Sequence, residues 1–457
     1  MTRLHKPRPK QKASSQSRPE PEKKPRQNSK YLVHARRRAL RSKKEDSRRL
    51  PAINLRMIAQ NTMEKYGFEH KLTIVVNAKA NAHDEFTLNK VGSKLRDLRY
   101  LLWSSIDSYY SQNLDQIEYC ERGQGGEILV KVAIADVDAF VPKGSILDEH
   151  AKINATSVYP GNDMFPMLPE QLSSDLSAFP MDCNSLAIVV EFAVLPRGNV
   201  RFGKVYRAFV RNKAQLSSGE IGAWLENKEM LPEIFEEMPE LAEQIKLQEE
   251  ASLRLSKFRE QGATDAEGDK TLGLCVAEKD WAKMIVENFM ICANKGMVKL
   301  LENAHRSPIR RVVAAPKDWN GVVQAAAAKG VALPAEPDAN ALTDFLAKEK
   351  KENPEGFSDL SLKIAKLLGP GEYALFDKQE PIEYFCIADM DYLVGTSPNQ
   401  KYMDLVVLRL VKAAAAQTHM PYSKAELAEL AAWCTERENA AKKVERTVKF
   451  AEASEKP

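Results

Sequence analysis

The sequence predicts an α/β (α+β) fold in which a mixed β-sheet is surrounded by many helices. Between Ile128 and Val210, apolar residues alternate or run together, as they do in half-buried and fully buried strands. After Ser218 they recur every three or four positions, which is the spacing of packed helices. The strands therefore precede the helices, and 457 residues are enough for a large core.

Residues 1–52 are predicted to form a disordered basic tail. Residues 1–50 contain 18 Lys and Arg against 4 Asp and Glu, together with five prolines. This composition buries too little apolar area to offset the entropy of ordering. The tail is interpreted as an arm that binds RNA phosphates, or otherwise as a solvated or targeting extension.

Residues 53–95 are expected to lead, through a helix at 53–65 and a strand at 72–76, into a main domain at 96–450, with a disordered end at 451–457. Strands are expected up to Val137 and in a hairpin of 186–195 and 200–210, after which the sheet ends. Helices are expected at 220–226, 231–259, 279–305, 319–329, 338–351, 360–368, 402–417 and 424–450.

The composition also argues against several classes of protein. The six cysteines include no CxxC pair, so neither a zinc site nor a disulfide framework is expected. No apolar run approaches the roughly 18 residues of a membrane span, and the N-terminus lacks the apolar segment of a secretory signal. We therefore expect a cytoplasmic protein with reduced thiols and no membrane contact.

Several motifs follow one another in the stretch Val132–Pro180 and beyond it. They are IADV at 134–137, SVYPG at 157–161, PMLPxxLSxxL at 166–176, IVENFMICAN at 285–294 and TER at 435–437. In order and spacing they resemble the ribonuclease II/R (RNB) family of 3′→5′ exoribonucleases, over roughly residues 55–450. The resemblance implies an RNB-like domain whose sheet and helices surround an RNA channel. The family's flanking cold-shock and S1 barrels are not expected in this chain.

The family's metal-binding loop resembles D-x5-D-x-D-D, and its four positions match Asp107, Asn113, Asp115 and Gln116. Hydrolysis of a phosphodiester by two Mg²⁺ ions relies on such clustered carboxylates. Here two of the four are amides. The resemblance therefore implies that Asp107 and Asp115 are the remaining catalytic carboxylates. They would hold Mg²⁺ weakly, with Asn113 as a further oxygen ligand, or hold none.

A second catalytic motif resembles T-S-P-I-R-[RK]-Y-x-D-L and matches residues 396–405. Gln400 takes the place of its arginine, which removes a bidentate contact to phosphate. Lys401 either supplies a replacement charge or is the ordinary basic residue of the motif. Ser397 is expected to cap a helix that begins at Pro398. Since the loss of one charged transition-state contact typically costs about 3 kcal/mol, three amide replacements predict weak or lost hydrolysis.

Three further residues are assigned to RNA by the resemblance. Tyr159 matches a tyrosine that stacks on the 3′-terminal base, and its alternative role is to cap the core from a turn. Arg311 falls near the channel. Glu436 either contacts the RNA end or is an exposed helical glutamate.

The sequence thus predicts a protein that binds single-stranded RNA, with weak or lost exoribonuclease activity. One alternative is an active Mg²⁺-dependent 3′→5′ exoribonuclease that releases nucleoside 5′-monophosphates. Another is a scaffold that associates with RNA, ribosomes or RNA-decay proteins through its basic tail. A monomer is favoured.

Overall fold

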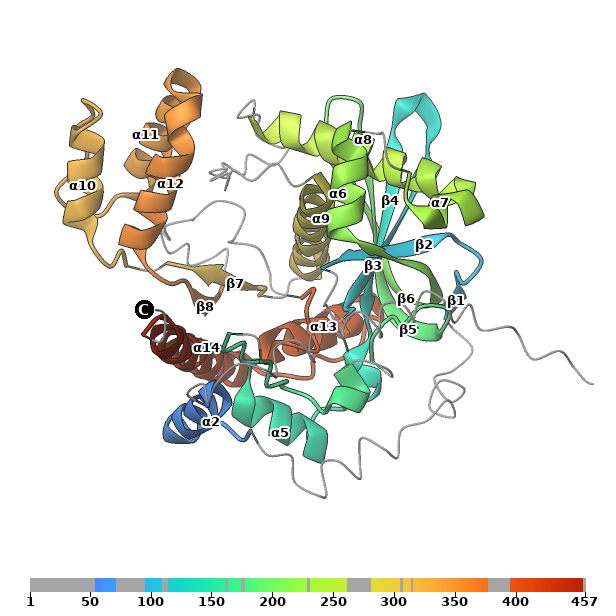
Figure 1. Cartoon of the computed structure of the whole chain (residues 1–457), viewed down its shortest axis with the longest axis horizontal. Helices are drawn as coiled ribbons and strands as arrows, with labels where there is room; N and C mark the ends of the chain where they lie inside the picture. The colour runs from blue at the N-terminus through green and yellow to red at the C-terminus, as the bar shows by residue number, and fades with distance from the viewer. Residues whose placement is uncertain are drawn as a thin grey trace, which may run out of the picture. The chain divides into compact units, whose positions relative to one another are not determined.

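A computed structural model describes residues 54–70, 95–108, 114–161, 163–173, 177–227, 231–260, 281–304, 307–313, 315–376 and 395–454 (Figure 1). The chain divides into Met1–Asn54 and Leu55–Pro457. Apart from Asn54, the described residues belong to the second unit. The tail predicted at 1–52, the strand predicted at 72–76 and the site residue Asn113 therefore lie outside them.

Five strands close into a ring that forms the centre of the second unit. They are β2 (Trp103–Asp107), β3 (Gln116–Arg122), β4 (Ile128–Ala135), β5 (Asn184–Val194) and β6 (Val200–Ser217), with the short β1 (Arg96–Asp97) beside β6. The long β6 closes the ring because its first part pairs antiparallel with β5 and its last residues pair parallel with β2. The sheet is mixed, as the sequence predicts.

The hairpin of β5 and β6 confirms the turn predicted at Pro196-Arg197-Gly198-Asn199. The N–H of Leu195 donates to the Asn199 carbonyl at 2.9 Å, and that of Gly198 donates to the Leu195 carbonyl at 2.8 Å. Gly198 has a φ of 92°, and a Cβ there would lie 2.1 Å from the carbonyl oxygen of Arg254. Glycine is therefore required at this turn.

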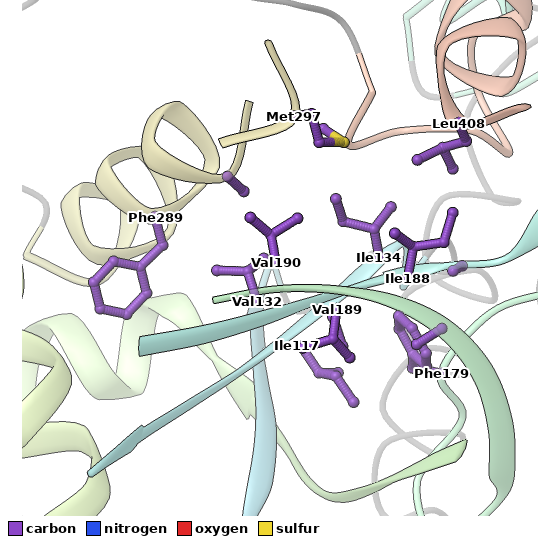
Figure 2. Packing of buried hydrophobic residues seen from close by; sticks show 14 of the residues in the cluster. Ile117, Val132, Ile134, Phe179, Ile188, Val189, Val190, Phe289, Met297 and Leu408 are labelled. Carbon is purple, nitrogen blue, oxygen red and sulfur yellow. The ribbon is translucent and has the colours of Figure 1, made fainter. Parts of the chain in front are cut away.

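Both faces of β4 and β5 are buried, which explains their nearly continuous apolar sequences. On one face, Val132 and Val190 lie towards Phe289 of α9 (Trp281–Asn303), as Figure 2 shows. On the other face, Val189 lies with Ile117. The helix α9 thus covers the ring from one side, and α6 (Ser218–Asn227) and α8 (Pro239–Glu260) pack on α9.

Most of the remaining helices agree with the predicted pattern, with differences at their ends, but the helix at Ile146–Asn154 is one that the sequence did not predict. The remaining helices are α2 (Leu55–Lys65), α5 (Ile146–Asn154), α7 (Glu233–Glu237), α10 (Trp319–Ala327), α11 (Ala339–Glu352), α12 (Pro354–Leu368), α13 (Tyr402–Ala415) and α14 (Lys424–Ala453).

Three of the helices predicted from apolar spacing differ from the prediction by more than two residues or by an internal break. The helix predicted at 231–259 is divided at Pro239 into α7 and α8, because proline has no N–H to continue the first helix. The helix α12 begins six residues before the predicted 360, since the Asn353 side chain accepts the N–H of Gly356 and caps it. The helix α14 continues to Ala453, beyond the domain end expected at 450.

The first sheet does not end at residue 210, because β6 continues to Ser217 and its last residues pair with β2. A second, two-stranded sheet follows. Its strands β7 (Ile309–Val312) and β8 (Glu372–Leu375) pair antiparallel. The helices α10, α11 and α12 are inserted between these strands and lie together in Figure 1. They bury a hydrophobic core of their own, which includes Val322, Phe345 and Ile364.

A buried ionic network attaches α13 to the segment that follows β4. The Arg409 guanidinium donates to Asp138 and to Asp148, both at 2.7 Å, and Lys412 donates to Asp136 and Asp138 at 2.7 Å. Such buried charges require partners, and here each has at least one. The network holds the second half of α13 beside the motif stretch 132–180.

Among the described residues, Cys120, Cys292 and Cys434 are buried, Cys183 is exposed, and none of the four forms a disulfide. No helix within the described part of the chain is long and apolar enough to span a membrane.

Candidate RNA-binding and active site

The two motifs expected to carry catalysis meet at Asp115, which lies just before β3. The side-chain amide of Asn399 donates to Asp115 Oδ1 at 2.6 Å, and that of Gln400 donates to Asp115 Oδ2 at 2.6 Å. The hydroxyl of Ser177 donates to Asn399 Oδ1 at 2.6 Å and fixes the orientation of that amide. Asn399 and Gln400 thus form an amide clamp that occupies both oxygens of Asp115.

The clamp also determines the electrostatics of Asp115. The residue is only 5% exposed. Burial raises the pKa of Asp115 to about 6, although the hydrogen bonds from Gln400 and Asn399 oppose the rise. Neutral amides stabilise a carboxylate less than a cation does. Asp115 therefore prefers its charged form much less strongly than a solvent-exposed aspartate does.

Asp107, at the end of β2, lies near a carboxylate that the sequence did not predict. Burial raises the pKa of Asp107 to about 6, the Ser105 hydroxyl opposes the rise, and Asp115 adds to it. Glu118 of β3 is buried, and burial together with the charge of Asp107 raises the pKa of Glu118 well above its ordinary value. Four buried oxygen atoms have no hydrogen-bond partner among the described residues. They are both carboxylate oxygens of Glu118, Oδ2 of Asp107 and Oε1 of Gln116.

These residues do not fit a centre for two Mg²⁺ ions. Both oxygens of Asp115 already accept hydrogen bonds from the amide clamp. Within the described ranges, no group of three or more His, Cys, Asp or Glu side chains is arranged to hold a metal ion. Hard divalent cations need several converging oxygen ligands with negative charge, which this arrangement does not offer.

The helix α13 begins at Tyr402, so the start predicted at Pro398 is wrong. The N–H of Ser397 donates to the carboxylate of Asp404 at 2.9 Å, and the residues after Pro398 form a turn. The N–H of Tyr402 donates to the carbonyl of Ala155 at 2.8 Å, which holds the backbone out of a helix until that point. The turn therefore supplies side chains to the site and no helix N-terminus.

Tyr159 is joined to the same cluster through Gln400. Its hydroxyl donates to Gln400 Oε1 at 2.8 Å, and its N–H donates to Glu445 Oε1 at 3.1 Å. The side chain is nevertheless 42% exposed, so it does not cap the core. Tyr159, Gln400 and Asp115 form a continuous hydrogen-bonded chain from the surface to the buried carboxylate.

Arg311 is engaged inside the protein. Its guanidinium pairs with Glu438 of α14 at 2.8 Å, and the Tyr373 hydroxyl donates to the same carboxylate. The pair joins β7 to α14. Glu436 is exposed, and at 100° per residue it points about 200° away from Glu438 around the helix.

Comparisons with known proteins identify the family to which this fold belongs. The RNB domain matches residues 95–417, which is more than half of the chain. The chain belongs to the RNB family. Ribonuclease R of Mycoplasmopsis pulmonis is 26% identical over 347 residues, which cover 72% of this chain and 46% of the relative. The RNB chain thus spans about half the length of the curated relatives it matches.

Solved structures show the same RNB fold. The structure of Mycoplasma genitalium RNase R in complex with ribose methylated single-stranded RNA aligns with a TM-score of 0.71 at 23% identity, covering 87% of this chain and 64% of that one. Yeast Ssd1, a pseudonuclease, aligns with a TM-score of 0.61 at 13% identity, covering 78% of this chain and 44% of that one. At these identities the likeness concerns the fold alone.

Sequence reasoning missed several residues of this RNB site. Asn399 is adjacent to Gln400, yet its amide carries no sign that it will meet Asp115, 284 positions away. Glu118 left no clear signal either, because its strand contains two further charged residues, Glu121 and Arg122. The family role assigned to Glu436 remains a prediction, and Glu438 is the glutamate that lies beside Arg311.

Proposed function

We propose that this chain is a single-stranded RNA-binding member of the RNB family whose 3′→5′ exoribonuclease activity is weak or lost. The observation that carries the proposal is the amide clamp on Asp115. Each oxygen of Asp115 has a second lone pair, but a metal ion bound there would have to share the carboxylate with the amides of Asn399 and Gln400. The family arginine that would face the phosphate is replaced by Gln400, which is itself part of the clamp.

RNA binding is supported by the family and by Tyr159. Mycoplasma genitalium RNase R has been solved with single-stranded RNA, and the fold of this chain is similar. Tyr159 has an exposed ring beside Gln400, and an aromatic ring can stack on a base of any sequence. The basic tail would add phosphate contacts from outside the described residues.

The alternative of an active Mg²⁺-dependent exoribonuclease is favoured by one observation. The partly buried Asp107 and the buried Glu118 place two carboxylates close enough for their charges to interact. One weakly held cation at these groups would leave slow hydrolysis. The cytoplasmic location, the monomeric state and an association with ribosomes or RNA-decay proteins stay predictions from the sequence.

The test uses the full chain with an end-labelled single-stranded RNA, in EDTA, in Mg²⁺ and in Mn²⁺. We expect binding in all three and little or no shortening of the RNA. Progressive shortening in Mg²⁺ that Asp115→Asn abolishes would overturn the proposal in favour of the active enzyme. The matched gain-of-function variant combines Asn113→Asp, Gln116→Asp and Gln400→Arg, and it should shorten the RNA faster than the parent does.

A further inference from the structure

A group of cationic side chains from two elements lies next to the amide clamp. Lys401 comes from the residue before α13, and Lys442 and Arg446 come from α14. Lys442 and Arg446 are four residues apart, and so are Glu438 and Lys442, so all three side chains lie on one face of α14. The sequence motifs single out neither Lys442 nor Arg446.

Contacts made by neighbouring residues fix where this face of α14 lies. Glu438, one turn before Lys442, pairs with Arg311 at 2.8 Å. Glu445, next to Arg446, accepts the N–H of Tyr159 at 3.1 Å. The helix therefore runs past the Tyr159 turn and the Arg311 pair with Lys442 between them.

Lys401 approaches the same place from the other side. It directly follows Gln400, which contacts both Asp115 and Tyr159. Its backbone forms a bridge with Thr156, three residues before Tyr159. Lys401 thus lies next to the residue that joins the buried clamp to the exposed ring.

Carboxylates near this cluster offset part of its positive charge, because Glu438 acts on Lys442 and Asp404 acts on Lys401. The side chains of Lys401, Lys442 and Arg446 have no hydrogen bond or ion pair with any described residue, whereas the Arg311 guanidinium already holds Glu438. Burial lowers the pKa of Lys442, and its neighbours Arg311, Lys401 and Arg446 lower it further, while Glu438 opposes them. Cations held this close repel one another, and an anion placed between them relieves the repulsion.

We propose that Lys401, Lys442 and Arg446 bind a phosphate group of single-stranded RNA without a metal ion, beside the ring of Tyr159. The inference rests on the proposed function and specifies how that function is carried out. Fixed side-chain cations supply the positive charge that divalent ions supply in a metal-dependent nuclease. An RNA strand fits better than an acidic peptide, because Tyr159 offers a stacking surface next to the phosphate site.

The test measures the affinity of the full chain for a fluorescent single-stranded RNA by anisotropy, as a function of salt, with EDTA or with Mg²⁺ at matched ionic strength. The triple variant Lys401→Gln, Lys442→Gln, Arg446→Gln should bind at least tenfold more weakly than the parent. Each lost phosphate contact should also reduce the slope of log affinity against log salt by about 0.7. The affinity of the parent should be the same in EDTA and in Mg²⁺.

Two control variants separate charge from structure. Lys443→Gln removes a cation of the same helix that lies 5.6 Å from the Tyr66 ring, outside the cluster, and should leave the affinity and the slope unchanged. Lys442→Arg keeps the charge and should retain binding. Far-ultraviolet circular dichroism and melting temperature check that each variant is folded.

The outcomes distinguish the two proposals. If the parent binds RNA and the folded triple variant binds with equal affinity and slope, the cationic site is refuted and the RNA-binding function stands. A requirement for Mg²⁺ in parent binding would also refute the metal-independent site. If the parent does not bind single-stranded RNA at all, both proposals fall.

Discussion

The buried carboxylates Asp115 and Asp404 differ in the hydrogen bonds that they accept. Asp115 has an amide on each oxygen, whereas Asp404 accepts the Ser397 N–H on Oδ2 and has no partner for Oδ1 among the described residues. Burial raises the pKa of both, to about 6 for Asp115 and to about 7 for Asp404. At the residue scale, the site thus holds acids that pass between neutral and charged forms close to neutral pH.

Asp404 makes stability depend on pH in a predictable direction. Burial raises its pKa from 3.8 to about 7, while Lys401 and the Ser397 N–H oppose the rise. The folded state binds this proton more tightly than the unfolded chain does, so the contribution of Asp404 to stability is greatest below about pH 4 and falls as the pH rises to 7. Asp404→Asn removes this titration.

The free energy of unfolding of Asp404→Asn should therefore rise relative to that of the parent as the pH increases. We expect the difference in the free energy of unfolding, variant minus parent, to rise by about 3 kcal/mol between pH 4 and pH 8, since three pKa units correspond to roughly 4 kcal/mol before relaxation of the site. Urea unfolding at each pH measures it. Asp344→Asn, at an exposed position of α11, is the matched control and should show a constant difference. A pH-independent difference for Asp404→Asn would contradict the assignment.

At the scale of elements, the approach of α9 to the ring depends on Gly296. A Cβ at this position would lie 2.8 Å from Val190 Cγ1 and 3.4 Å from Phe202 Cδ1. Val190 is β-branched and held in a buried strand, so it has little freedom to move away. The glycine is retained although it weakens the helix, because it lets the helix and the strands pack closely.

Gly296→Ala is expected to lower the free energy of unfolding by about 1–2 kcal/mol, because overpacking outweighs the gain in helix propensity. The same change at Gly219 of α6 is the control. There a Cβ would meet only Ser217 Oγ, at 3.8 Å. Gly219→Ala should leave stability unchanged or raise it by about 0.5 kcal/mol, and chemical denaturation of the two variants compares them directly. Equal effects at both positions would mean that the close contact at Gly296 is unimportant.

At the scale of the whole molecule, the described chain contains separate hydrophobic cores. The principal core is built around the ring of strands and the helices that cover it, while α10, α11 and α12 share another. The three-helix insert is joined to the rest through β7, β8 and the pair of Arg311 with Glu438. Units with their own cores can open separately.

Ile364→Ala should therefore loosen the insert and leave the ring unaffected. Ile364 is fully buried in the core of the insert, and truncation of such a side chain costs about 2–4 kcal/mol. Hydrogen exchange should become faster over 319–368 and stay unchanged in β5 and α9. The matched variant Ile188→Ala, in the principal core, should instead speed exchange in β5 and α9. Faster exchange throughout the protein for Ile364→Ala would show that the cores unfold together.

The sequence by itself determined the features that depend on neighbouring residues. The helices from Ser218 onwards follow from their apolar spacing, and the hairpin at Gly198 follows from its turn residues. The fold class and the RNB family follow from the motifs, and the amides at 113, 116 and 400 are read directly from them. Local rules failed at Ser397, where the Asp404 carboxylate and a backbone contact with residue 155 override the capping preference.

Only the tertiary structure decided what the site can do. The ring closes because β6 pairs with β2 across more than a hundred residues, and the clamp joins Asp115 to residues 284 and 285 positions later. Lys442 and Arg446 are ordinary helical cations in the sequence and become a candidate phosphate site only beside Tyr159 and Lys401. The physical reason is that the charge state and the partners of a buried group depend on the groups that packing brings to it, and these come from distant parts of the chain.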